Sequence, residues 1–262
     1  MTPALVVTDL DGTLVRSDGT VSARTRAAIA AVEAAGVPFV MVTGRPPRWM
    51  TQVAQDTGHR GLAVCANGAL VYDLHTERVV EASLIDAAAA AGVVDALRRA
   101  LPGITFAVED GGALFGHEPG YRPRWETGEH RVEPIETLYA AGVAKLLARH
   151  EGMSGVDLHS AATEALGPLV EATYSSPDGL LEMTAVGITK ATGLASLAER
   201  HGVPAGDVVA FGDMPNDLPM LAWAGLAVAM ANAHPDVLTV ADEVTASNDE
   251  DGVAAVLDRW FG

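Results

Sequence analysis

Apolar runs separated by amphipathic segments fill the first third of the chain. The apolar runs predict strands at residues 4–10, 37–44 and 62–69. The segments between them predict helices at residues 22–36 and 47–58. Ser22 is a suitable N-cap for the first helix, and Gly36 is a suitable C-terminal stop. Strands that are apolar on both faces and alternate with helices indicate a parallel sheet covered on both sides.

The last third repeats this pattern, whereas the middle of the chain differs. Strands are predicted at residues 207–213 and 226–232, and helices at residues 189–202, 217–225 and 251–262. The middle holds an Ala-rich helix, short strands and loop signals, at residues 86–101, 104–110, 113–118 and 118–130. We therefore expect an α/β fold: a Rossmann-like core of residues 1–83 and 184–262, with an inserted α+β unit at residues 84–183.

The composition and net charge of the chain limit the kinds of molecule that it is expected to bind. The chain has 262 residues, 49% of them hydrophobic, and a formal net charge of -17. That charge argues against general binding of nucleic acid, but it permits a small phosphate ester at a locally positive site. No run approaches the roughly 18 apolar residues of a membrane span, and no signal peptide is expected. The single cysteine, Cys65, lies in an apolar run and is expected to be buried, which fits a reducing cytoplasm.

The stretch "ALVVTDLDGTLV" ends a predicted strand on two acidic residues, Asp9 and Asp11. Residues two apart on extended backbone point the same way, so their carboxylates would share a small volume. Such a pair is costly unless a cation or a shared proton offsets the repulsion, and Mg²⁺ is a suitable hard cation. Gly12 lets the chain turn there. A surface Asp-Gly turn would give the same letters.

Polar residues also follow two other predicted strands. Thr43 and Gly44 come after one of them and suit phosphate oxygens, although Thr43 could simply cap a helix. Asp213, Asn216 and Asp217 follow another, where a carboxylate could complete a magnesium site or a polar loop could form an Asx turn. Ligands of parallel α/β sheets bind beyond the carboxyl ends of the strands.

Lysine is rare in this chain, which has Lys145 and Lys190 beside 15 arginines. A lysine where arginine is the usual cation suggests a need for a compact point charge, although Lys190 could be an ordinary exposed helix residue.

Together, four segments resemble the motifs of the haloacid dehalogenase superfamily. They are "DLDGT", "VTGR", the Lys190 segment and "GDMPND", in the order that the superfamily has them. The stretch "CANGALVYD", the insertion and the C-terminal tail are similar to the Cof-type, or subclass IIB, phosphatases. The resemblance covers the predicted core and is weakest in the insertion. One departure is Ala191, which stands where a glycine is common after the lysine.

The resemblance implies a covalent mechanism and a magnesium cofactor. Asp9 would be the nucleophile that becomes an aspartyl-phosphate, and Asp11 the general acid and base. Mg²⁺ would be held by the Asp9 side chain, the Asp11 carbonyl and the Asp213 carboxylate, and Asp217 would orient that shell. The resemblance also implies a group that binds the transferring phosphoryl oxygens: Thr43, the Gly44 amide, Lys190 and Asn216.

The insertion would act as a cap that closes over the site and selects the leaving group. Asn67 and Gly68 would contact substrate or the cap hinge, or form a plain turn. We hypothesise that the segment "GHEPGYRPRW" reaches the substrate through one or more of its larger side chains: His117, Tyr121, Arg122, Arg124 and Trp125. A solvated loop with one packed aromatic is the alternative.

Other charged side chains lie in or beside these motifs. Arg45 and Arg48 could add positive charge at the mouth of the site or be surface helix residues. His117 and Glu118 are not expected to form a zinc site, because no matching ligand cluster follows them in the sequence.

The leading function is a Mg²⁺-dependent phosphomonoester hydrolase of small phosphorylated metabolites. Sugar phosphates are the main expectation, with pyridoxal phosphate or flavin mononucleotide also possible. A dedicated disaccharide-phosphate or glycosyl-phosphoglycerate phosphatase and a phosphomutase are alternatives. A non-catalytic binding module is disfavoured, because such a module is expected to lose one of the four central residues, which are all present: Asp9, Asp11, Lys190 and Asp213. The chain is expected to be a monomer or a weak homo-oligomer.

Overall fold

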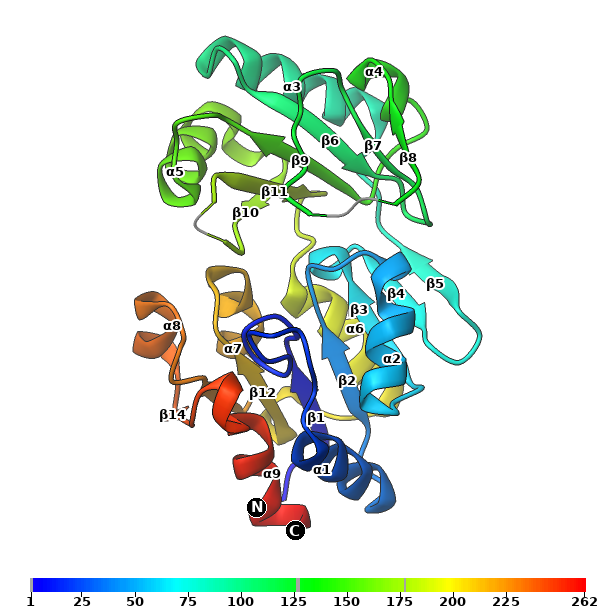
Figure 1. The fold of residues 1–262 in the computed structure, drawn as a ribbon, viewed down its shortest axis with the longest axis vertical. Helices are drawn as coiled ribbons and strands as arrows, with labels where there is room; N and C mark the ends of the chain where they lie inside the picture. Colours follow the sequence, from blue (N-terminus) through cyan, green and yellow to red (C-terminus); the bar gives the residue numbers. More distant parts are fainter. Residues whose placement is uncertain (1, 126–127, 177) are drawn as a thin grey trace.

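The structure is a computed structural model that describes residues 2–125, 128–176 and 178–262. Two sheets lie one above the other in Figure 1. The first has the order β14-β13-β12-β1-β2-β3-β4-β5. Its strands are β1 (Leu5–Thr8), β2 (Phe39–Val42), β3 (Leu62–Cys65), β4 (Leu70–Asp73), β5 (Arg78–Ala82), β12 (Val208–Gly212), β13 (Leu226–Ala229) and β14 (Glu243–Val244).

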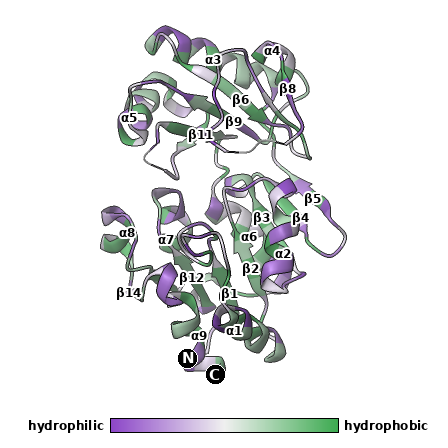
Figure 2. Ribbon diagram, in the orientation of Figure 1, coloured by the Kyte–Doolittle hydropathy of each residue, from purple (hydrophilic) through white to green (hydrophobic). Residues whose placement is uncertain are grey.

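The centre of this sheet is parallel, as the apolar runs predicted. β1 pairs in parallel with both β2 and β12, and all three strands are fully buried. The far edge is different, because β4 and β5 are antiparallel and were not predicted as separate strands. β5 is mostly exposed and carries both hydrophilic and hydrophobic residues (Figure 2), and its charged Arg78 and Glu81 suit an edge strand. The sheet is therefore mixed rather than wholly parallel.

Helices cover both faces of the first sheet. α1 (Ala23–Ala34), α2 (Met50–Thr57) and α9 (Gly252–Phe261) pack into the apolar core on one face. α6 (Lys190–His201), α7 (Leu218–Trp223) and α8 (Pro235–Val240) pack into the core on the other. Ser22 caps α1 as predicted, because its side chain accepts a hydrogen bond from the Thr25 amide. Cys65 is buried, also as predicted.

The second sheet has the order β10-β11-β9-β6-β7-β8. Its strands are β6 (Thr105–Glu109), β7 (Phe115–His117), β8 (His130–Val132), β9 (Lys145–Arg149), β10 (Glu171–Thr173) and β11 (Leu180–Thr184). α3 (Ala87–Ala100), α4 (Ile135–Leu138) and α5 (Gly155–Leu166) contribute to the apolar core on its outer face. The opposite face looks toward the first sheet (Figure 1), with a small apolar cluster that includes Phe115, Leu147 and Leu180.

The chain passes between the two sheets twice. It leaves the first sheet after β5 and returns between β11 and α6. The division of the chain at residues 84 and 183 stays a prediction. Residues 126 and 127 of the loop predicted at 118–130 lie outside the described residues. Among the helices of the described chain, none combines the length and the apolar character needed to cross a bilayer.

Candidate active site

Polar side chains gather where three parallel strands of the first sheet end. Asp9 follows β1, Thr43 follows β2 and Asp213 follows β12, and the three strands are neighbours in the sheet. Carboxylate oxygens of Asp9, Asp213 and Asp217 lie within 4.8 Å of one another, and all three residues are buried. Within the described ranges this is the group of acidic, histidine or cysteine side chains with a spacing that suits a metal ion.

Lys190 is buried among these carboxylates. Its Nζ donates to Oδ1 of Asp9 and to Oδ1 of Asp217, each at 2.6 Å. Burial lowers the pKa of Lys190, but the two carboxylates outweigh that effect and raise the pKa above its ordinary value. The lysine therefore stays charged, and it holds two of the three acidic side chains in place.

Both carboxylate oxygens of Asp217 accept hydrogen bonds. Its Oδ2 accepts hydrogen bonds from the amides of Asp213 and Met214, at 3.0 Å each, while Oδ1 accepts from Lys190. The backbone at Gly212 passes so close that a Cβ there would lie 2.7 Å from the Asp217 Cβ. Asp217 thus fixes the loop that carries Asp213.

The cluster carries more negative than positive charge. Burial raises the pKa of Asp9 well above its usual range, with Asp217 and Asp213 adding to the rise and Lys190 opposing it. Burial and the neighbouring Asp217 raise the pKa of Asp213 to about 7. A divalent cation with a preference for oxygen ligands would relieve this repulsion, so the residues fit such an ion.

Asp11 points away from this cluster. β1 ends at Thr8, so the extended backbone expected through Asp11 is not present. The Asp11 side chain is 62% exposed and forms an ion pair with Arg45. Nε of Arg45 donates to Oδ2 of Asp11 at 2.8 Å, and Nη2 donates to Oδ1 at 2.5 Å. The side chains of Asp9 and Asp11 still line the same cavity, but only Asp9 belongs to the carboxylate cluster.

The loop after β2 is pinned by several polar contacts. The buried Thr43 side chain accepts a hydrogen bond from the Arg45 amide at 3.0 Å, and its carbonyl accepts from the Asn67 amide. The Gly44 carbonyl accepts from Nζ of Lys145, a residue of β9 in the second sheet, at 2.7 Å. This loop therefore contacts both Asn67 and the second sheet.

Asn67 and Gly68 form part of a short turn, η2 (Ala66–Gly68), beside the site. Oδ1 of Asn67 accepts from Asn216 at 3.1 Å, and its Nδ2 donates to Glu182 of β11 at 2.5 Å. Gly68 has φ +107°, and a Cβ there would lie 2.0 Å from the Thr189 carbonyl oxygen. A side chain at Gly68 is thus excluded by the start of the helix that carries Lys190.

A cavity of about 520 Å³ lies between the two sheets at this place. Its floor includes Asp9, Asp11, Gly44 and Asn216. Its other walls include side chains that the sequence reasoning did not assign to the site: Trp49, Glu109, Lys145, Leu147, Leu180 and Glu182. The missed signal was a charged residue next to buried apolar strand residues, as at Lys145, the first residue of β9, and at Glu182 in the middle of β11.

The hypothesised specificity segment lies mostly elsewhere. Of its five side chains only Trp125 lines this cavity, with its ring 6.2 Å from that of Trp49. His117 and Tyr121 are buried beside Phe115. Two arginines of the segment, Arg122 and Arg124, line a separate surface hollow. Arg45 lines the cavity, and Arg48 forms an ion pair with Glu109.

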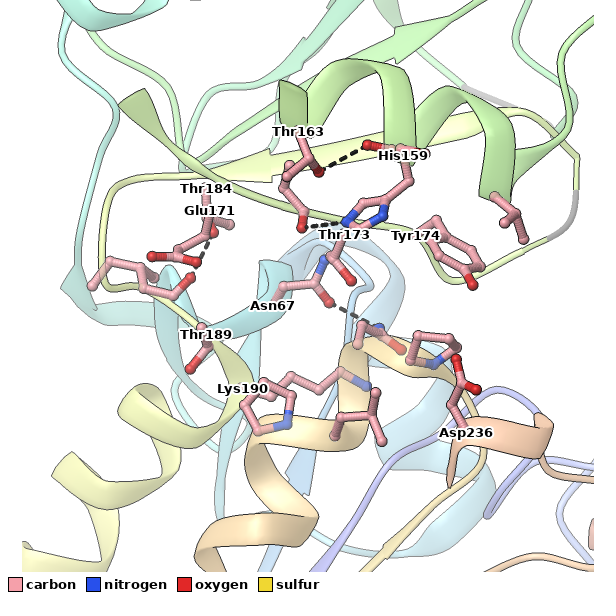
Figure 3. Close-up of a pocket in the computed structure, with 18 of the residues that line it drawn as sticks. Asn67, His159, Thr163, Glu171, Thr173, Tyr174, Thr184, Thr189, Lys190 and Asp236 are labelled. Carbon is pink, nitrogen blue, oxygen red and sulfur yellow. Dashed lines mark hydrogen bonds between the residues drawn. The ribbon is translucent and has the colours of Figure 1, made fainter. Parts of the chain in front are cut away.

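A second cavity, of about 820 Å³, is drawn in Figure 3, and Asn216 lines both cavities. His159 and Thr163 of α5 and Tyr174, the residue after β10, line it from the second sheet, and Asn67 and Lys190 line it from below. Asp9 and Asp213 do not line it. Of the three clustered carboxylates, Asp9 lines the smaller cavity.

Comparisons with known proteins extend over nearly the whole chain. The family model for haloacid dehalogenase-like hydrolases matches residues 6–257. A 5-amino-6-(5-phospho-D-ribitylamino)uracil phosphatase of Bacillus subtilis is 28% identical, covering 99% of this chain and 98% of that protein. A pyridoxal phosphate phosphatase of Escherichia coli is 27% identical, covering 97% of each. A solved haloacid dehalogenase-like hydrolase from Bacteroides thetaiotaomicron has a TM-score of 0.78 and 29% identity, covering 98% of this chain and 99% of that one.

Proposed function

Because the chain belongs to the haloacid dehalogenase-like hydrolases, we propose that it is a Mg²⁺-dependent phosphomonoester hydrolase of small phosphorylated metabolites. The observation that carries this proposal is the buried group of Asp9, Asp213 and Asp217 around Lys190, at the ends of adjacent parallel strands. Asp9 of that group lines a cavity large enough for a small ester.

Mg²⁺ would be held by the Asp9 and Asp213 carboxylates and by the Asp11 carbonyl. When bound, it would supply positive charge to the phosphoryl group and to the two acidic side chains that hold it. Thr13 donates to Oδ1 of Asp213 at 2.7 Å, and Lys190 donates to Oδ1 of Asp9. These hydrogen bonds orient the two carboxylates from one side, which is the usual task of groups behind a metal site.

In the first step, a carboxylate oxygen of Asp9 attacks the phosphorus atom, and the bond to the leaving oxygen breaks. Asp11 gives its proton to that oxygen, which leaves as the alcohol. In the second step, water attacks the phosphorus of the aspartyl-phosphate while Asp11 takes its proton. Phosphate leaves, and the Asp9 carboxylate is restored. Asp11 has to part from Arg45 to act in this way.

Lys190 and the loop after β2 would bind the transferring phosphoryl group, together with Asn216. Positioning and charge neutralisation supply most of the catalysis in phosphoryl transfer. Lys190 is already charged and held beside Asp9, the proposed nucleophile. Residues 84–183 would form the cap, whose sheet closes the cavity from above.

Sugar phosphates are our main proposal for the substrate. The phosphatases named above act on a ribitylaminouracil phosphate and on pyridoxal phosphate, so phosphorylated cofactors and their precursors belong in the same screen. A dedicated disaccharide-phosphate or glycosyl-phosphoglycerate phosphatase and a phosphomutase are the other candidates.

The test is phosphate release from a panel of sugar phosphates, nucleotides and phosphorylated cofactors, with and without Mg²⁺. The Asp9→Asn variant is the control, because it keeps the size of the side chain and removes the nucleophile. We expect turnover that needs Mg²⁺ and is lost in Asp9→Asn. Absence of turnover on every ester, from a folded protein that binds Mg²⁺, would overturn the proposal. Transfer of phosphate to a second position of the sugar would favour a mutase.

A further inference from the structure

Three charged side chains form a row across the face of the second sheet that looks toward Asp9. Glu109 on β6 is the direct cross-strand partner of Lys145 on β9. Glu182 on β11 is paired with Leu147, two residues from Lys145, so it lies diagonally across from the lysine on the same face. All three side chains are buried and line the cavity above the carboxylate cluster.

Buried charged side chains need hydrogen-bond or ion-pair partners, and not every donor and acceptor of these three residues has one at short distance. Arg48 occupies both carboxylate oxygens of Glu109. Lys145 makes one short bond, 2.7 Å to the Gly44 carbonyl. Its contact with Oε1 of Glu182 is longer, at 3.4 Å, and the hydroxyl of Ser175 lies 3.3 Å from the same oxygen. Oε1 of Glu182 is therefore weakly bonded, and Lys145 has donor capacity to spare.

Both groups are nevertheless held in position by their other contacts. Lys145 is tied to the Gly44 carbonyl, and Oε2 of Glu182 accepts from Asn67 at 2.5 Å. A fixed donor and a fixed acceptor at 3.4 Å have the chemistry to bind one hydroxyl group, which accepts from the ammonium and donates to the carboxylate.

The neighbouring wall is apolar. Trp49 and Trp125 meet edge to face at 6.2 Å and line the same cavity, with Leu147 and Leu180 beside them. A polyhydroxylated chain or ring has C–H faces that can pack on such a wall while its hydroxyls turn to charged groups.

We propose that Lys145 and Glu182 are specificity residues that bind a hydroxyl of the leaving group, so that the substrate is a phosphate ester of a sugar or sugar alcohol. This inference rests on the proposed phosphatase function and deepens it. A site built to bond a hydroxyl rejects an analogue that lacks it strongly, because its own polar groups are then buried without a partner.

The experiment compares kcat/KM for ribitol 5-phosphate with that for pentyl phosphate, which has the same carbon chain without the hydroxyls. Pyridoxal phosphate serves as a planar aromatic ester. We expect the unsubstituted protein to prefer ribitol 5-phosphate by about 100-fold or more. Lys145→Met and Glu182→Gln should each lower that preference by about 10- to 100-fold. The double variant should lose less than the product of the two, because both residues bind one group.

Arg48→Met is the matched control. It removes another contact across the cavity, the Arg48–Glu109 ion pair, and keeps both of the side chains that are proposed to bind the hydroxyl. We expect it to change kcat/KM for all three esters by a common factor. Glu182→Gln is nearly isosteric, so it provides a second test if Lys145→Met folds poorly; thermal melting reports folding in each case.

The outcomes separate the two proposals. If the preference for ribitol 5-phosphate survives both substitutions, the specificity inference is overturned and the phosphatase function stands. The same holds if kcat/KM for ribitol 5-phosphate does not exceed that for pentyl phosphate or pyridoxal phosphate. Equal losses on every ester also overturn it, since the pair would then only hold the cavity together. No Mg²⁺-dependent hydrolysis of any ester overturns the function and the inference with it.

Discussion

Asp11 and Arg45 face each other in a two-pronged ion pair across the mouth of the cavity, with contacts of 2.8 and 2.5 Å. The carboxylate is mostly exposed, so this pair contributes no more than about 1 kcal/mol to stability. The pair instead determines where the proposed general acid rests before substrate arrives.

We expect Asp11→Asn to separate activity from stability. The amide keeps the size of the side chain and can still accept from Arg45, but it cannot give or take the proton. kcat should fall by about 10²- to 10⁴-fold, whereas the melting temperature should hardly change. Steady-state kinetics and thermal melting measure both. A variant that keeps normal kcat would show that Asp11 is not the acid.

Lys190→Met should destabilise the protein chiefly when metal is absent. The substitution leaves Asp9 and Asp217 buried without their shared cation, at a cost of about 3–5 kcal/mol in the free energy of unfolding. Saturating Mg²⁺ should recover part of that loss, because it neutralises Asp9. Urea unfolding with and without Mg²⁺ gives the comparison. Equal destabilisation in both conditions would argue against a shared site.

Binding of Mg²⁺ should weaken as the pH falls below about 7. Burial raises the pKa of Asp213 from its ordinary 3.8 to about 7 in the metal-free protein, so protons compete with the ion for this carboxylate. The apparent affinity should drop by about tenfold per pH unit below 7 and level off above it. Titration calorimetry at pH 6, 7 and 8 tests this. An affinity independent of pH in that range would contradict competition between protons and Mg²⁺ for the Asp213 carboxylate.

The raised pKa of Asp213 also makes the stability of the metal-free protein depend on pH, in the opposite direction to the Mg²⁺ affinity. A group whose pKa is raised by folding contributes stability that is fully present below its unfolded value, here about 3.8, and is lost as the pH rises through about 7. The Asp213 contribution should therefore favour the apo form at lower pH, and Mg²⁺ should remove that trend. Melting temperatures of the apo and Mg²⁺-bound forms between pH 5 and 8 report it.

Gly68→Ala should disturb catalysis through the start of α6. A Cβ at this position would overlap the Thr189 carbonyl oxygen, and the positive φ is itself unfavourable for alanine. We expect a loss of about 2–4 kcal/mol in stability and a lower kcat, because the strain falls next to Lys190.

Gly58→Ala is the control for that experiment. Gly58 also has a positive φ, +78°, but a Cβ at this position would meet open space, with no atom beyond its chain neighbours within 4 Å. The substitution should cost only about 1 kcal/mol and leave kcat unchanged. If both alanine variants keep normal kcat, the contact at Gly68 does not position the lysine.

The sequence was sufficient to predict which polar residues meet at one edge of the first sheet. Polar residues that directly follow buried parallel strands must meet at one edge of the sheet, which brings Asp9, Thr43 and Asp213 together. The placement of Lys190 beside Asp9 came from the family resemblance. The extended geometry expected for Asp11 was wrong, because the strand ends at Thr8 and the chain turns before that residue.

The walls of the cavity could not be predicted in the same way. Lys145 and Glu182 lie in separate strands, and their neighbours across the cavity, Gly44 and Asn67, are far away in the sequence. Local patterns do not specify which face of one sheet will lie over another. The hypothesis for the 116–125 segment stays a prediction: Trp125 lines the cavity, whereas His117 and Tyr121 pack beside Phe115.

The way the chain re-enters the first sheet has an evolutionary consequence. Lys190 is the first residue of α6, and only residues 185–189 separate it from the end of β11. Thr189, the last of these, caps the helix with its own side chain. A recombination event that replaced everything between β5 and Thr189 would thus exchange the whole specificity region and leave the lysine and its cap intact. The incoming segment would have to supply a new hydrogen-bond donor for the Gly44 carbonyl and a new acceptor for the Asn67 side chain. Any cap that replaces this one therefore needs at least these two groups.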